Sequence, residues 1–133
     1  MKFKAFGLAG VGISLLAVPA LGHHPSASID YEQTVEFSGM VKEFRWTNPH
    51  SWLHVMIADE GGQMVEWSLE MGSPGTLARS GWNPRTVVFG EEVAVTLYPL
   101  KDGSPSGQLI TVETPEGTVM SGEAPPKPAT NAE

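Results

Sequence analysis

The chain has 133 residues, no cysteine and a formal net charge of −7. About one hundred residues make one domain, so this length excludes a protein of several domains. Without cysteine, disulfides, Cys-ligated zinc, thiol nucleophiles and covalently attached c-type haem are all excluded. The acidic balance argues against a nucleic-acid-binding protein, which needs a basic patch to displace counterions. Any site chemistry must therefore come from histidine, carboxylate, methionine or the backbone.

The first 22 residues predict a secretory signal peptide. Lys2 and Lys4 precede an uncharged apolar run over residues 5–18, and small residues follow it. The run is shorter than the roughly 20 residues that a membrane span needs, although an uncleaved anchor is the alternative. Cleavage after Ala20 or after Gly22 satisfies the small-residue rule. We therefore expect a periplasmic or secreted protein with no stable membrane anchor after cleavage.

Residues 35–120 are predicted to form a series of strands, with one short helix after the third strand. Gly39 predicts a bulge or bend in the first strand, and 59–62 a hairpin turn. Ser73 as N-cap and Pro74 as first helical residue predict a helix that ends near residue 80. Alternating or β-branched residues predict strands at 35–46, 52–58, 63–71, 93–100, 108–113 and 118–120.

This order of elements predicts a mainly β fold. A short helix after the third strand is expected of a small OB-like Greek-key barrel of five to six strands, here over residues 35–120. A small β-sandwich is the alternative. Residues 23–34 form an N-terminal segment with a histidine pair. Residues 121–133 contain no large apolar residue, which predicts a disordered tail.

The four histidines fall into two clusters and are the candidate metal ligands: His23, His24, His50 and His54. If cleavage follows Gly22, the free amine and imidazole of His23 can chelate one ion, and His50 or His54 would add a third nitrogen. If cleavage follows Ala20, the amine, two amide nitrogens and the His23 imidazole form a square-planar set. Both arrangements suit copper, so a copper site is the predicted cofactor.

Ordinary roles for the same histidines remain open. A histidine pair in an N-terminal segment is often solvated, His50 follows Asn-Pro and suits a turn, and His54 suits a strand surface. His50 and His54 are about 13 Å apart if the strand already includes both, too far to share one ion. The supporting ligands considered are Asp30, Glu66, Glu70 and, as a soft ligand for Cu(I), Met56.

The chain also resembles a bacterial family of small exported proteins known only as a domain of unknown function. The motifs that carry this resemblance are His23-His24, Gly39-x-Val41, Trp46-Thr47-Asn48-Pro49-His50-x-Trp52, Trp67-x-x-Glu70-x-Gly72-Ser73-Pro74, Leu77-x-Arg79-x-Gly81-Trp82, Gly90-x-x-Val93 and Lys101-Asp102-Gly103. The resemblance spans about residues 23–120 and implies an exported β-rich domain without an assigned activity. Pro25-Ser26-Ala27 departs from the pattern, in which an aromatic residue is more usual after the histidine pair.

Two functions follow as hypotheses. The first is non-catalytic copper binding through the histidine pair and the Asn-Pro-His turn. The second is a ligand- or protein-interaction module that uses an aromatic and polar face of the barrel without metal. That face comprises Trp46, His50, Trp52, Glu70 and Arg79. No catalytic constellation is present, and an enzyme would need a redox metal at the first site.

Overall fold

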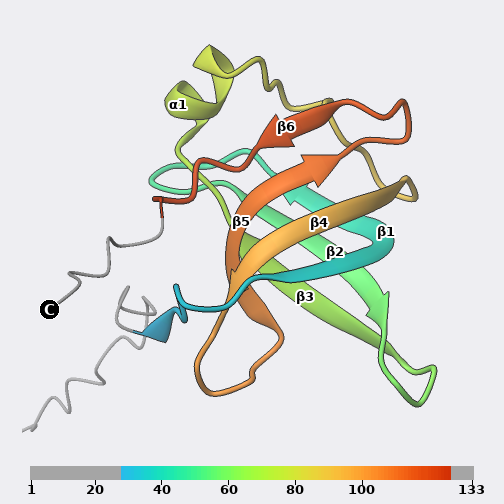
Figure 1. The fold of residues 1–133 in the computed structure, drawn as a ribbon. Helices are drawn as coiled ribbons and strands as arrows, with labels where there is room; N and C mark the ends of the chain where they lie inside the picture. Colours follow the sequence, from blue (N-terminus) through green and yellow to red (C-terminus); the bar gives the residue numbers. More distant parts are fainter. Residues whose placement is uncertain (1–27, 127–133) are drawn as a thin grey trace, which may run out of the picture.

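A computed structural model of the chain describes residues 28–126. Within them, six strands and one short helix follow one another in the predicted order, and the sequence prediction of a mainly β fold is confirmed (Figure 1). No helix of the described part is long and apolar enough to cross a membrane. The elements are β1 (Val35–Arg45), β2 (Trp52–Ala58), β3 (Met64–Glu70), α1 (Pro74–Arg79), β4 (Glu92–Pro99), β5 (Ser106–Glu113) and β6 (Val119–Ser121).

Five of the strands close into a barrel. The sheet order is β3-β2-β1-β4-β5-β6, and β3 also pairs with β5 in parallel. This second pairing joins Ser68 to Ser106 and Glu70 to Gln108, so it returns the sheet onto itself. Closure pairs part of the β3 edge, which could otherwise recruit another strand. The predicted OB-like barrel is confirmed, and β6 is an extra strand beside β5.

Helix α1 connects β3 to β4 at one end of the barrel (Figure 1). It begins where predicted, because the Ser73 hydroxyl accepts from the Thr76 backbone N–H at 3.2 Å and Pro74 occupies the first helical turn. Leu77 is its buried residue and anchors it on the core.

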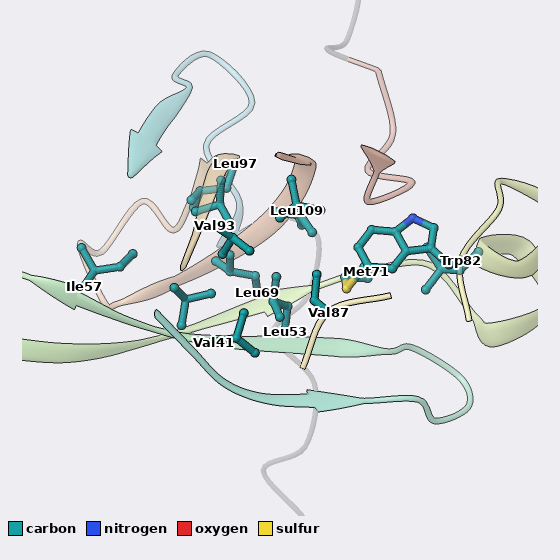
Figure 2. Packing of buried hydrophobic residues seen from close by; sticks show 14 residues of the cluster. Val41, Leu53, Ile57, Leu69, Met71, Trp82, Val87, Val93, Leu97 and Leu109 are labelled. Carbon is teal, nitrogen blue, oxygen red and sulfur yellow. The ribbon is translucent and has the colours of Figure 1, made fainter. Parts of the chain in front are cut away.

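The core fills the barrel with side chains from every barrel strand (Figure 2). Leu53, Val55 and Ile57 of β2 all point inward, as their alternation predicts. Trp82, which follows α1, covers the end of this core near Met71 (Figure 2).

The irregularity in β1 is not where the sequence suggested. Gly39 is in regular register with Val93, and the shift falls between Val41 and Glu43. The prediction of a bulge or bend at Gly39 is therefore wrong. A glycine fits here because the backbone of β2 passes too close to leave room for a side chain. A Cβ at Gly39 would lie 2.5 Å from the backbone oxygen of Met56.

The packed chain continues past the predicted start of the tail. The Gly122 N–H donates to the carbonyl of Ile110 at 2.8 Å, and the Gly122 carbonyl accepts from the Gly72 N–H at 3.0 Å. Ala124 packs against the cluster of Ile29, Tyr98 and Leu100. The two ends of the described chain therefore meet on one side of the barrel (Figure 1).

Candidate functional site

His50 lies just before β2, in the loop that connects it to β1. Its Nδ1 is 3.0 Å from the carbonyl oxygen of Met71 and 3.4 Å from Oε1 of Glu70. A carbonyl oxygen only accepts, so Nδ1 carries the proton and donates it. In the neutral ring, Nε2 then keeps its lone pair, and the side chain is 47% exposed.

His50 borders a cavity of about 90 Å³ between the end of β3, the start of β5 and the chain after β6. Glu70 comes from the last position of β3, paired with Trp52 on one side and with Gln108 on the other. Its side chain is 21% exposed, and its carboxylate faces the His50 ring. The cavity is lined by His50, Glu70, Met71, Gly72, Gln108, Glu123, Ala124 and Pro125.

Tyr31, in the chain before β1, places a hydroxyl group beside Gln108 of the cavity lining. The Tyr31 hydroxyl donates to Oε1 of Gln108 at 2.9 Å, and its ring meets Tyr98 edge-on with centroids 5.1 Å apart. Burial raises the pKa of the Tyr31 phenol above its ordinary value and nearby Glu70 adds to the rise, while the Gln108 hydrogen bond opposes it. The Tyr31 hydroxyl therefore remains a proton donor at neutral pH.

His54 has a different environment from His50. Its Nδ1 lies 3.1 Å from both Oε1 of Glu66 and the hydroxyl of Ser68, two neighbours on β3. Only 8% of the residue is exposed, and its Nε2 is buried without a hydrogen-bond partner. The expectation of a strand-surface histidine is wrong, because cross-strand neighbours cover the ring.

Two ion pairs lie on the same outer face as His54. A hydrogen bond from Lys42 lowers the pKa of Glu66, and one from Arg45 lowers the pKa of Glu43. Lys42 sits at the register shift of β1. Both pairs are exposed, so they set local charge more than they stabilise the fold.

The other predicted site residues are dispersed. Trp52 is half-buried between Arg45 and Glu70 in the strand pairing. Asp30 accepts from the backbone N–H of Glu32, and Arg79 donates to the Thr76 hydroxyl on α1. His23 and His24 lie outside the described residues.

Over residues 28–126, no three or more histidine and acidic side chains are grouped so that they could hold a metal ion. The structure brings His50 and Glu70 together, while His54 contacts Glu66 instead. At the cavity, His50 therefore has one neighbouring carboxylate, that of Glu70, while Glu123, the other acidic residue of the lining, accepts a hydrogen bond from the Ser80 hydroxyl.

Sequence reasoning missed Tyr31 and Gln108 at this site. Neither belongs to a motif: Gln108 is next to Glu70 through the parallel β3–β5 pairing, and Tyr31 contacts Gln108 from the chain before β1. The one available signal was the polar position Gln108 at the start of a predicted strand.

The comparisons with known proteins agree with the resemblance noted from the motifs. A model of a family of unknown function, DUF6152, matches residues 12–109, which is most of the chain. No curated protein and no solved structure matches it. The predicted membership in a domain-of-unknown-function family is thereby confirmed: the chain belongs to the family of unknown function DUF6152.

Proposed function

We propose that this protein is exported and binds Cu(II) without turnover, with His50 as the barrel's nitrogen ligand. The observation that carries the proposal is the 3.0 Å contact between Nδ1 of His50 and the Met71 carbonyl. Metal-binding histidines usually donate their second ring N–H to a carbonyl or carboxylate, which orients the ring and fixes the tautomer. His50 has this arrangement and keeps Nε2 available.

Glu70 is the second ligand that the barrel offers. Its Oε1 lies 3.4 Å from the His50 ring, so it can either share the Nδ1 proton or turn one oxygen toward an ion in the cavity. One imidazole and one carboxylate are an incomplete set for Cu(II), which favours four nitrogen or oxygen ligands in a tetragonal arrangement. We propose that the remaining ligands come from outside the barrel.

The histidine pair His23-His24 is the proposed source of those ligands. Ile29 bridges to Leu100 and belongs to the cluster against which Ala124 packs, and Ala124 also lines the cavity beside His50. Ile29 follows His24 by five positions in the sequence, and an extended chain spans at most about 17 Å over that length. The proposal requires the histidine pair, which lies outside the described residues, to reach His50 over this length.

Export is the second part of the proposal. It rests on Lys2 and Lys4, the apolar run over 5–18 and the small residues that follow. Cleavage after Gly22 would give His23 a free amine as an additional ligand. Cleavage after Ala20 would instead give the amine, two amides and the His23 imidazole.

The test uses the full-length gene expressed in a bacterial host and the protein recovered from the periplasm. Reading its N-terminal residue tests export and identifies the cleavage point. Cu(II) is then titrated into wild type, His50→Ala, Glu70→Gln and His23→Ala/His24→Ala, with Glu113→Gln, an exposed carboxylate on β5, as control. Binding is followed by the d–d band and by nitrogen hyperfine splitting.

We expect one equivalent of Cu(II), weaker binding in His50→Ala and Glu70→Gln, and wild-type behaviour in the control. Binding that is lost only with the histidine pair would mean a solitary N-terminal chelate, which overturns the role of His50. Micromolar or weaker binding that none of the substitutions changes would overturn the copper function itself.

A ligand- or protein-interaction module is the second candidate. It is favoured by Trp52, which sits half-buried on the outer face of β2 between a basic and an acidic neighbour, Arg45 and Glu70. Trp46, predicted for the same face, instead packs on Phe44 with ring centroids 5.8 Å apart. A protein without specific Cu(II) binding, combined with a partner whose binding is lost in Trp52→Ala but not in Trp46→Phe, would favour this function.

A further inference from the structure

Three methionines gather on the outer face of β1, β2 and β3. Met40 and Met56 are direct partners in the β1–β2 pairing. Met56 faces Glu66 across the β2–β3 pairing, and Met64 lies two residues from Glu66 on the same face of β3. Direct cross-strand neighbours have Cβ atoms about 5 Å apart and diagonal ones about 7–8 Å, within reach of long side chains.

The exposure of these methionines is unusual for the residue type. Met40 is 49% exposed and Met64 is 55% exposed, while Met56 between them is half-buried. The other two methionines of the described chain behave ordinarily, since Met71 is buried and Met120 packs against the core. The inward neighbours Val41 and Val55 belong to the core cluster, and none of the three outer-face methionines is among the side chains that pack against it.

We propose that Met40, Met56 and Met64 form a binding site for a soft monovalent cation, Cu(I) or Ag(I). Thioether sulfur is a neutral, polarizable ligand that selects Cu(I) over the harder divalent ions. Methionine has three rotatable bonds beyond its backbone, so three side chains on adjacent strands can converge on one ion without moving the sheet.

The surroundings of the three thioethers suit a cation. The cross-strand row continues beyond Met40 to Glu92 of β4 and beyond Met56 to Glu66 of β3. Lys42 forms an ion pair with Glu66 at one end of this row. At the other end, Glu92 is the acidic neighbour of Met40. His54 precedes Met56 by two residues on the same strand face, and its Nε2 is buried without a hydrogen-bond partner.

This site goes beyond the proposed Cu(II) site and does not depend on it. The Cu(II) proposal uses the nitrogen and oxygen ligands at the cavity, His50 and Glu70, whereas the thioethers are on the outer face of the sheet. The cation is supplied as Cu(I) or as Ag(I), so binding involves no change of oxidation state. The two proposals can therefore fail separately.

The test compares wild type with the triple variant Met40→Leu/Met56→Leu/Met64→Leu, with Met120→Leu as the matched control. Leucine keeps the volume and hydrophobicity of methionine, so the variants should remain folded, which circular dichroism checks. Ag(I) is titrated while the methionine methyl resonances are followed by NMR. Cu(I) affinity is measured anaerobically in competition with a chromophoric Cu(I) chelator.

We expect three methionine methyl resonances to shift together and saturate at one equivalent of Ag(I). The triple variant should lose Ag(I) and Cu(I) binding, while Met120→Leu and His50→Ala should retain both. Unshifted methyl resonances in wild type, or equal affinity in wild type and the folded triple variant, would overturn the proposal. Loss of Ag(I) binding in His50→Ala with retention in the triple variant would also overturn it.

Discussion

The indole N–H of Trp82 donates to the backbone carbonyl of Ser121 at 2.8 Å. This bond joins the segment after α1 to the end of β6, 39 residues later in the sequence. Trp82 is buried, and its ring also packs against Phe44 with centroids 5.5 Å apart. One side chain therefore holds together the helix end, the last strand and the core.

Replacing Trp82 by phenylalanine removes the hydrogen bond and leaves the Ser121 carbonyl without this donor. We expect the free energy of unfolding to fall by at least about 1 kcal/mol, the typical value of one such bond, with a further loss from the smaller ring. Chemical denaturation measures it. The control is Trp52→Phe, at a half-buried position on the outer face. An equal loss in both variants would contradict the role given to the Ser121 bond.

Leu53→Ala should be among the costly core substitutions. Leu53 is fully buried in the barrel core (Figure 2), and truncating a leucine in such a site costs about 2–5 kcal/mol. Val119→Ala, at a position that is 62% exposed, should change stability by less than about 0.5 kcal/mol. Thermal and denaturant unfolding of both variants compare the two sites, and similar losses would mean that Leu53 is not packed as described.

Gly107→Ala should destabilise the barrel where β4 and β5 meet. A Cβ at Gly107 would lie 2.1 Å from the backbone oxygen of Tyr98, so the strands would have to separate. Overpacking of this kind costs about 1–3 kcal/mol. Gly61→Ala is the control, because its added Cβ comes no nearer than 3.4 Å to Asp59. A lower melting temperature only in Gly107→Ala is the expected result, and equal melting temperatures would disprove the close approach.

The Glu66 carboxylate should titrate below its ordinary range because Lys42 donates to it. A lowered pKa in the folded state stabilises the protein above the ordinary carboxyl pKa, and this contribution is lost as the pH falls through the lowered value. Lys42→Met should therefore raise the pKa of Glu66 and reduce the acid sensitivity that this group causes. Carboxyl NMR titration measures the pKa, with Lys101→Met as control. An unchanged Glu66 pKa would show that the ion pair does not form in solution.

Much of the barrel follows from local patterns in the sequence. The alternation in β2 placed Leu53, Val55 and Ile57 inside, and Ser73-Pro74 fixed the start of α1 through N-cap chemistry. Both features depend on residues that are close together in the sequence, so they can be predicted from the sequence alone. The bulge after Val41 could not be predicted, because it depends on the register between β1 and β2.

The site was less predictable, because its residues are joined by long-range pairing. Glu70 was singled out as a supporting residue, but its neighbour Gln108 comes from a strand that pairs with β3 only on barrel closure. Similarly, only Met56 of the three outer-face methionines was predicted from the sequence as a candidate soft ligand. Its partners Met40 and Met64 become visible only when the register places three strands side by side.

The meeting of Ile29 and Ala124 in one apolar cluster has a practical consequence for handling the protein. A tag fused next to either end of the described residues would be tethered beside this cluster, and Ala124 also lines the cavity at His50. A polyhistidine tag there would itself chelate copper, and its binding would be mistaken for that of the protein. The β2–β3 hairpin turn, away from both ends of the described residues in Figure 1, is a better place for a purification handle that contains no metal ligand.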